Sequence, residues 1–409
     1  MHEFTLFKQE NIKTTLKKES SFSFVRTTML LGFIFRWVVF LMIVNRVFAD
    51  IDPYFVVDDW KYETLAKTFA KYSKGPLDFD YFDYLTIGFA EQFWPWVMCF
   101  STKLFNYAYI GRIINIFIST FTIWVIYKLT FEISENIKTA LLAARLFAFM
   151  PLPVLTCCFP IKDIFLTFTV MYAFYIFVCL QKGNKVSPFR LVLCGALLIC
   201  TFFTRGAIVE LLMIFLVVYF AQKLIGEQKY IQLVAFSFVV LVLILVFKDR
   251  VAASFQTKVD DYGGYAELGN GIRYIKVTGL KDIYKLPLAY GFATLQPITL
   301  DYIDGAKVSW SSVVAVSNIT MYPIAMGNFV YMFEKKKNLF FWLSSFIMYS
   351  AVIILSLGIY RHYLFLLPVQ MINFSLFVEI DKKQNLTISF IGALALFLII
   401  LAATAFNVF

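Results

Sequence analysis

Apolar runs of bilayer-spanning length recur along the chain and are separated by polar segments. A spanning helix needs about 20 mostly apolar residues. This measure predicts spans at 29–48, 110–128, 139–157, 164–181, 190–204, 207–224, 230–248, 311–333, 338–358, 363–379 and 386–406. Because 190–204 is short and 83–107 is apolar enough to dip into the membrane, the pattern predicts about 11 transmembrane helices, within a range of 10 to 13.

The predicted fold class is therefore an all-α polytopic integral membrane protein, with residues 1–409 forming a single transmembrane domain. Two segments between spans are long, 49–109 and 249–310. No tandem repeat or low-complexity stretch divides the chain. A cleavable signal peptide is not expected, because the first apolar run follows 28 mixed residues and lacks a small-residue cleavage site.

Lysine and arginine in the short loops predict the orientation, since cytoplasmic loops carry an excess of these residues. If the N-terminus is cytoplasmic, every short loop on that side is basic. The long segment 49–109 on the other side carries nine Asp or Glu against five Lys. The cytoplasmic basic residues are Lys8, Lys13, Lys17, Lys18, Arg26, Lys128, Lys138, Lys182, Lys185, Arg190, Lys223, Lys229, Lys335, Lys336, Lys337, Lys382 and Lys383.

Composition excludes several other classes of protein. The chain is 60% hydrophobic and only 16% charged, whereas soluble domains are about half apolar and a quarter charged. The net charge of +10 does not indicate a nucleic-acid partner, because the basic residues are scattered anchors rather than one patch. The six cysteines lie in apolar runs without CxxC spacing, and there are two His, so a zinc site is not expected. Composition and loop lengths favour a bacterial inner membrane.

The two long segments carry their own patterns. In 49–109, Tyr62, Leu65, Ala66, Phe69 and Ala70 follow helical spacing, which predicts an amphipathic helix on the outer leaflet. The aromatic run 93–96 is typical of the membrane interface. Segment 249–310 is rich in turn signals and is predicted to form a lid that recognises the acceptor.

Ionisable side chains gather near the predicted outer ends of the spans. Such residues are expensive at membrane depth and usually mark function or a buried pair. We therefore expect one outward cavity in which carboxylates face several cations. The exception is Arg145, midway along 139–157, which is expected to snorkel or to bond a carbonyl. The residues at the outer ends are Asp58, Asp59, Arg112, Lys162, Asp163, Arg205, Glu210, Arg361 and His362.

This set of groups suits a transfer reaction between a hydroxyl nucleophile and an anionic leaving group. A carboxylate can take the proton of the acceptor hydroxyl as general base. Arginine and lysine can neutralise a departing phosphate, and the arginine fork can bond two of its oxygens. A lipid phosphate is the natural substrate for a cavity that opens sideways to the bilayer.

Several short motifs resemble those of one superfamily of membrane enzymes. The string Asp58-Asp59-Trp60-Lys61-Tyr62 after the first span is similar to the acidic motif of GT-C glycosyltransferases, which use polyprenyl-linked sugars. The segments 111–115, 150–151 and 159–163 also resemble that family, and 361–363 with Pro368 is loosely similar to a late Arg-Tyr-Pro pattern. The likeness covers roughly 29–210. Wzy-type capsule and O-antigen polymerases are similar too.

The resemblance implies roles for the outer residues. Asp58 or Asp59 would be the general base, and Arg205, Lys162, Arg112 and Arg361 would bind the donor phosphate. Asp163, Tyr62, Glu210 and His362 would support them. Asp58, Asp59 and Asp163 could together hold a divalent metal as hard oxygen ligands, although nothing in the sequence demands one. The donor would be a polyprenyl (di)phosphate-linked sugar, and the acceptor a saccharide or a lipid-linked saccharide.

Each assignment has a structural alternative. Asp58 or Asp59 can be a helix N-cap, and Arg112, Lys162, Arg205 and Arg361 can be anchors at the membrane boundary. A transporter or flippase of lipid-linked oligosaccharides is the alternative from another class, and broken helices at the midplane would favour it. An assembly subunit with a degenerate site is a third reading.

Overall fold

The computed structural model describes residues 2–45, 57–86, 92–226, 319–332 and 365–405, with a few isolated residues between 228 and 345. Within these residues every regular element is a helix. The predicted lid at 249–310 and most of the spans at 230–248 and 338–358 lie outside them. The helices are α1 (His2–Val44), α2 (Val57–Tyr72), α3 (Phe79–Leu85), α4 (Phe93–Phe105), α5 (Ile110–Ser134), α6 (Ile137–Phe149), α7 (Pro151–Cys157), α8 (Asp163–Gln181), α9 (Pro188–Gly226), α13 (Tyr322–Tyr331), α15 (Leu367–Ile380) and α16 (Lys382–Ala405).

Four of the described helices contain segments long and apolar enough to cross a membrane: Ser23–Val44, Ile110–Ser134, Asp163–Gln181 and Pro188–Arg205. The pair α6 and α7 passes the same test together but is bent by 54°. These helices confirm the prediction of a helical, membrane-embedded protein. The count of about 11 spans remains a prediction, because much of the second half of the chain lies outside the described residues.

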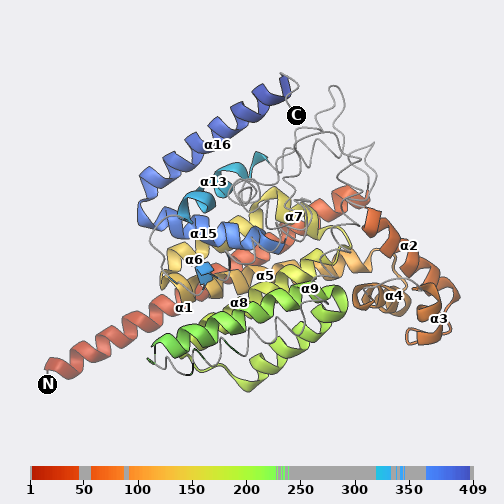
Figure 1. Ribbon diagram of the computed structural model, residues 1–409, viewed down its shortest axis with the longest axis horizontal. Helices are drawn as coiled ribbons and strands as arrows, with labels where there is room; N and C mark the ends of the chain where they lie inside the picture. Colours follow the sequence, from red (N-terminus) through yellow and green to blue (C-terminus); the bar gives the residue numbers. More distant parts are fainter. Residues whose placement is uncertain are drawn as a thin grey trace.

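The long helices run side by side, and the shorter helices α2, α3 and α4 gather at one end of them (Figure 1). Helix α5 packs on both α6 and α8, and α1 packs on α5 and α6. Helix α8 lies inside the bundle, with 89% of its apolar segment buried. Large apolar side chains such as Phe121, Phe203 and Leu398 are exposed on other helices, as expected where a helix faces lipid.

Helices α6 and α7 are separated by a break at Met150 and Pro151. Pro151 has no N–H to bond the carbonyl of Phe147 four residues earlier. Arg36 of α1 supplies the missing donors, because its Nη2 donates to Phe147 O at 3.0 Å and its Nη1 to Ala148 O at 2.9 Å. The Nε donates to Ser119 Oγ of α5 at 3.0 Å. One fully buried guanidinium thus joins three helices and closes the break.

The structure adds a second cation at membrane depth to the one singled out from the sequence. Arg145, the residue singled out from the sequence, is exposed on α6. Arg36, in the middle of the first span, is the buried cation and was missed. Its signal was visible, since it is a charged residue inside the apolar run 29–44. Its buried neighbours explain why it can stay there: backbone carbonyls at a helix break accept from it.

We expect Arg36→Met to lower the free energy of unfolding by about 2 kcal/mol, because buried carbonyls lose their donors. Thermal unfolding of the purified protein in detergent measures the change. Arg145→Met, on the exposed side of α6, is the matched control and should leave the melting temperature unchanged. Equal melting temperatures for the two variants would contradict the role given to Arg36.

The helices of segment 49–109 pack on one another rather than on a lipid surface. The predicted helix is confirmed as α2, but its apolar residues Tyr62, Leu65, Ala66 and Phe69 are buried, and α2 packs on α4. The apolar face is therefore not available to the outer leaflet, which corrects that expectation. Lys103 of α4 caps the C-terminal end of α2, because its Nζ donates to Ser73 O at 2.8 Å.

Candidate functional site

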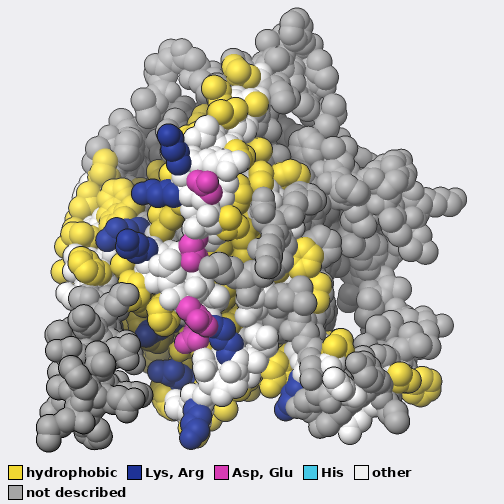
Figure 2. Space-filling model, turned by 90° about the vertical axis from the view of Figure 1, so that its left-hand side faces the viewer, with side chains coloured by type: hydrophobic (Ala, Val, Ile, Leu, Met, Phe, Trp, Pro, Cys, Tyr) yellow, Lys and Arg dark blue, Asp and Glu magenta, His cyan; other side chains and the backbone are white. Residues whose placement is uncertain are grey.

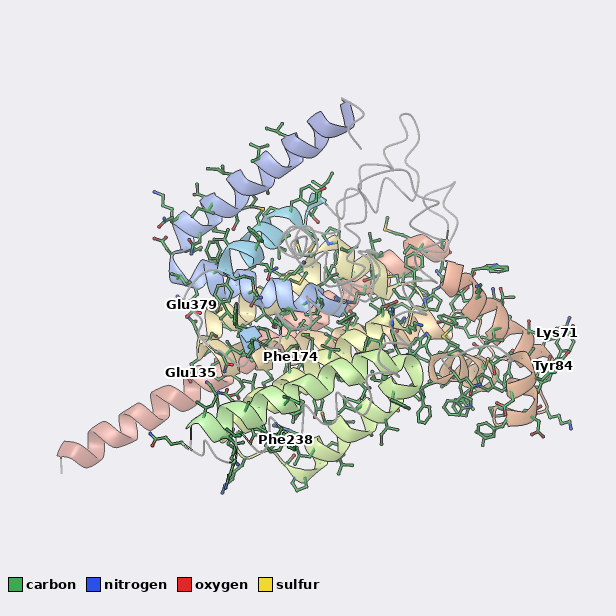
Figure 3. All side chains as sticks on the ribbon, viewed as in Figure 1. Lys71, Tyr84, Glu135, Phe174, Phe238 and Glu379 are labelled. Carbon is green, nitrogen blue, oxygen red and sulfur yellow. The ribbon has the colours of Figure 1, made fainter. Side chains whose placement is uncertain are left out.

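Polar side chains gather at the two opposite ends of the long helices. Glu135 and Glu379 lie at one end, and Lys71 and Tyr84 lie at the other, beside α2 to α4 (Figure 3). Helix α5 joins the two, since it begins at Ile110 next to α4 and ends at Ser134 near Glu135. The two ends have different architecture.

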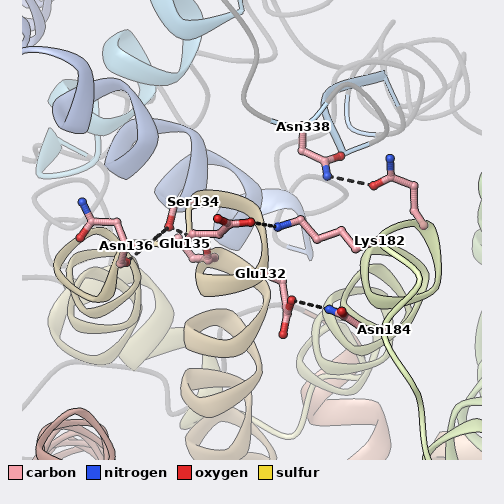
Figure 4. Close-up of polar contacts among 9 residues, drawn as sticks. Glu132, Ser134, Glu135, Asn136, Lys182, Asn184 and Asn338 are labelled. Atoms are coloured by element: carbon pink, nitrogen blue, oxygen red, sulfur yellow. Dashed lines mark hydrogen bonds and ion pairs between the residues drawn. The ribbon is translucent and has the colours of Figure 1, made fainter. Parts of the chain in front are cut away.

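The end marked by Glu135 and Glu379 is a polar surface. Lysine, arginine and acidic side chains are interspersed there (Figure 2). Paired side chains link α5 to the C-terminal end of α8 across it (Figure 4), and Asn136 donates to Glu379 of α15. Such exposed pairs contribute at most about 1 kcal/mol each, and the Glu135 side chain is 78% exposed. The pairs are Lys182–Glu135 at 2.7 Å, Asn184–Glu132 at 2.9 Å, Asn136–Glu379 at 3.1 Å and Asn338–Gln181 at 3.0 Å.

At the opposite end, a buried ion pair joins α2 to α5. Arg112 Nε donates to Glu63 Oε1 at 2.5 Å, and both side chains are fully buried. The guanidinium also lies over the rings of Tyr109 and Phe159, at 5.2 Å and 5.4 Å from their centroids. Lys67 lies 3.9 Å from the other oxygen of Glu63. Two charges taken out of water require such close partners.

Glu63 was missed by the sequence reasoning. Its signal was its position, because it is a carboxylate on the same helical face as Ala66 and Ala70 of the apolar stripe. Arg112, by contrast, was singled out from the sequence as an ionisable residue of this end. The structure adds that its guanidinium is held by a carboxylate from segment 49–109.

The loop between α7 and α8 is held by side chains of α4 and α5. Asn115 donates from Nδ2 to Phe159 O at 2.6 Å and to Ile161 O at 2.9 Å. Trp94 donates from Nε1 to Pro160 O at 2.8 Å. Trp94 is itself buried, so at least this member of the aromatic run 93–96 lies inside the protein instead of at the membrane interface.

The same loop leads directly into the next pair of predicted site residues. Lys162 is 7% exposed and Asp163 is fully buried. Arg205 Nη1 lies 4.0 Å from Asp163 Oδ1, at the outer limit of an ion pair. Arg205 has extended backbone angles that interrupt α9, so it lies at the predicted junction of two helical segments. Arg112, Lys162 and Arg205 therefore lie around one end of the bundle.

Asp58 and Asp59 occupy the first turn of α2. Their side chains lie outside the described residues, so the predicted contact between these carboxylates and the cations is untested. The helix register is informative nevertheless. Asp59 precedes Glu63 by four residues, which places the two positions one turn apart on the same face of α2. Tyr62, predicted to support the site, is buried beside Glu63.

The remaining predicted site residues cannot be compared with the structure. Arg361 and His362 lie outside the described residues, and so does the side chain of Glu210 on α9. Among the described residues, no group of three or more His, Cys, Asp and Glu side chains could hold a metal ion. The proposed ligand set of Asp58, Asp59 and Asp163 includes undescribed side chains and stays a prediction.

The cysteines have the structural character expected from their apolar surroundings. All six are free thiols, and all except Cys200 are buried. In α4, burial raises the pKa of the Cys99 thiol to about 12, so this thiol stays protonated at neutral pH and is a poor nucleophile. The six are Cys99, Cys157, Cys158, Cys179, Cys194 and Cys200.

The fold and this cluster of charges define a class, a helical membrane protein with buried ion pairs at one end of its bundle. Comparisons with known proteins do not narrow the class further. No protein-family model matches the chain, and no curated protein matches it significantly.

Proposed function

We propose that the protein is a membrane glycosyltransferase. It transfers a sugar or an oligosaccharide from a polyprenyl (di)phosphate donor to an acceptor on the extracytoplasmic side. One observation carries the proposal. The helix that begins with Asp58 and Asp59 is joined through Glu63 to Arg112, at the same end of the bundle as Lys162, Asp163 and Arg205. A carboxylate motif and three cations are thus anchored to one end of one bundle.

In the proposed reaction, Asp58 or Asp59 takes the proton of an acceptor hydroxyl. The hydroxyl oxygen then bonds the anomeric carbon of the donor sugar, and the bond from that carbon to the phosphate oxygen breaks. The lipid phosphate leaves with the bonding electron pair. Arg112, Lys162 and Arg205 neutralise its charge, with Arg361 as a fourth cation. Low water content at a buried site strengthens each of these interactions.

The proposed orientation puts this end outside. The opposite end carries exposed Lys138, Lys182 and Lys185, in loops predicted to be cytoplasmic. The N-terminus is then cytoplasmic, the membrane is proposed to be a bacterial inner membrane, and 249–310 is proposed to cover the acceptor. Repeated transfer of lipid-linked units, as in Wzy-type polymerases, would use the same groups, and the acceptor distinguishes the two.

A second function, transport of lipid-linked oligosaccharides, would use a helix break such as the one between α6 and α7. Broken helices in transporters expose carbonyls that bind substrate or coupling ions. Here Arg36 occupies the carbonyls of Phe147 and Ala148. These carbonyls are therefore not free to bind a substrate or a coupling ion, which weighs against transport.

The test uses the purified protein in lipid nanodiscs with a panel of undecaprenyl diphosphate-linked sugars and saccharide acceptors. We expect release of undecaprenyl (di)phosphate together with a lengthened acceptor. The same protein in liposomes, loaded with a fluorescent lipid-linked sugar, reports transport. Movement of the label between leaflets without release of the lipid phosphate would reject the transferase and favour the transporter.

A further inference from the structure

Three consecutive carbonyls between α7 and α8 are bound by side chains from two other helices. Asn115 uses its amide group on Phe159 O and Ile161 O, at 2.6 Å and 2.9 Å. Trp94 binds the carbonyl between them, that of Pro160, at 2.8 Å. Both donors are buried. The path of this loop is therefore set by α4 and α5.

Close packing brings the donors to the loop. A Cβ added at Gly111 of α5 would meet the end of the Met98 side chain of α4, so α4 and α5 lie in close contact here. The Trp94 ring also stacks on Phe165 in the first turn of α8, with centroids 6.1 Å apart. Helices α4, α5 and α8 thus converge on the segment 159–161.

The positions of Lys162 and Asp163 depend on how this loop is held. A peptide unit is planar, so only two soft dihedrals per residue separate the held carbonyl of Ile161 from the next Cα atoms. Fixing three carbonyls in a row therefore fixes where the two side chains start. In a trans peptide the N–H points opposite to the C=O, so the N–H groups of Ile161 and Lys162 point away from Asn115 and Trp94.

The side-chain oxygen of Asn115 is in a different situation from its nitrogen. Asn115 Oδ1 is buried and accepts no hydrogen bond from the described part of the chain. A buried acceptor without a donor is rare and requires an explanation. A residue needed only to fill space could be apolar and would leave no buried acceptor without a donor. Asn115 is needed for its two amide donors, and its buried oxygen comes with them.

We propose that Asn115 and Trp94 are positioning residues for lipid-phosphate recognition. They hold 159–161 so that Lys162 and Arg205 form a preset cationic cradle for the phosphate of a lipid-linked ligand, with Asp163 orienting Arg205 through their 4.0 Å contact. The identity of that ligand as a polyprenyl phosphate rests on the proposed function. Holding the cradle in place before binding avoids ordering it afterwards, and a displacement of about 1 Å can cost about 100-fold in rate.

Two variants test the cradle in nanodiscs. Asn115→Leu removes both donors at similar side-chain volume, and Trp94→Phe removes one donor. Thr122→Val is the matched control, because Thr122 is buried in the same helix and donates only to its own helix, at Ile118 O. The first readout is kcat/KM for a polyprenyl-linked donor per folded protein. The second is the shift in Tm on adding undecaprenyl phosphate, with phosphatidylglycerol and inorganic phosphate as parallel probes.

We expect Asn115→Leu to lower kcat/KM about 10- to 100-fold and to abolish the undecaprenyl phosphate shift, and Trp94→Phe to have a smaller effect of the same kind. Thr122→Val should keep both readouts. A lower basal Tm with unchanged kcat/KM and an unchanged shift in both variants would overturn the proposal, since the clamp would then be structural only. If Asn115→Leu does not fold, the same two readouts for Trp94→Phe test the proposal.

The outcomes separate this inference from the proposed function. If no donor supports transfer but undecaprenyl phosphate stabilises the wild type and not Asn115→Leu, the transferase fails and the cradle stands. An equal shift with phosphatidylglycerol would assign the cradle to phospholipid headgroups and overturn the substrate assignment. A shift with none of the three probes would overturn the cradle itself.

Discussion

Asp59→Asn is expected to lower the rate of sugar transfer by about 100- to 10,000-fold, the range for loss of a general base. The expectation follows from the register of α2, which places Asp59 one turn before Glu63, on the face whose carboxylate binds Arg112. The position of Asp58 is one residue earlier and is not on that face of α2, so Asp58→Asn is expected to have the smaller effect. Transfer is measured as release of undecaprenyl (di)phosphate.

Asparagine is chosen because it removes the base while keeping a side chain of similar size. Because Asp58 and Asp59 lie inside the first turn of α2, they do not cap it, and the substitution should cost at most about 1 kcal/mol of helix-dipole stabilisation. Asp83→Asn is the matched control, since Asp83 is an exposed carboxylate on α3 in the same segment 49–109. Full activity of both Asp58→Asn and Asp59→Asn would end the assignment of this motif to catalysis.

Glu63→Gln is expected to destabilise the protein by about 3–5 kcal/mol, the cost of leaving one charge of a buried ion pair uncompensated. Arg112 would lose the carboxylate at 2.5 Å while staying buried against Tyr109 and Phe159. Thermal or denaturant unfolding in detergent measures the change. Glu135→Gln provides the contrast, because its 78% exposed side chain should contribute at most about 1 kcal/mol.

The double variant Glu63→Leu with Arg112→Met distinguishes structure from function. Replacing both charges by apolar groups of similar size is often neutral for stability, so most of the lost stability should return. Transfer should not return, because Arg112 is proposed to neutralise the phosphate. A double variant that recovers both stability and transfer would show that the ion pair only holds α2 on α5.

The proposed site depends on contacts made between distant parts of the chain. Glu63 reaches Arg112 across 49 residues, and Trp94 reaches Pro160 across 66. The sequence reasoning selected Arg112, Lys162 and Arg205 because isolated charges beside apolar runs are conspicuous. It did not select Glu63, Asn115 or Trp94 as site residues, because their importance lies mainly in their partners.

The burial of Arg36 and of the apolar face of α2 could not be predicted for the same reason. Arg145 and Arg36 are both single arginines within apolar runs, and nothing local to either run says which one is buried. The packing of α1 against α5 and α6 decides it in favour of Arg36, whose donors meet the carbonyls freed by Pro151. The apolar face of α2 is likewise lipid-facing or protein-facing depending on whether a partner such as α4 is present.

The sequence by itself determined that this is a helical membrane protein, and it located the ends of the four described candidate spans to within six residues. Those properties follow from local composition, because a bilayer requires about 20 apolar residues and internal backbone hydrogen bonds wherever a helix crosses it. Only the tertiary structure decided which charges are buried, which are paired, and which side chains hold the loop before α8. Burial and pairing belong to two or more segments at once, so no pattern along one segment can specify them.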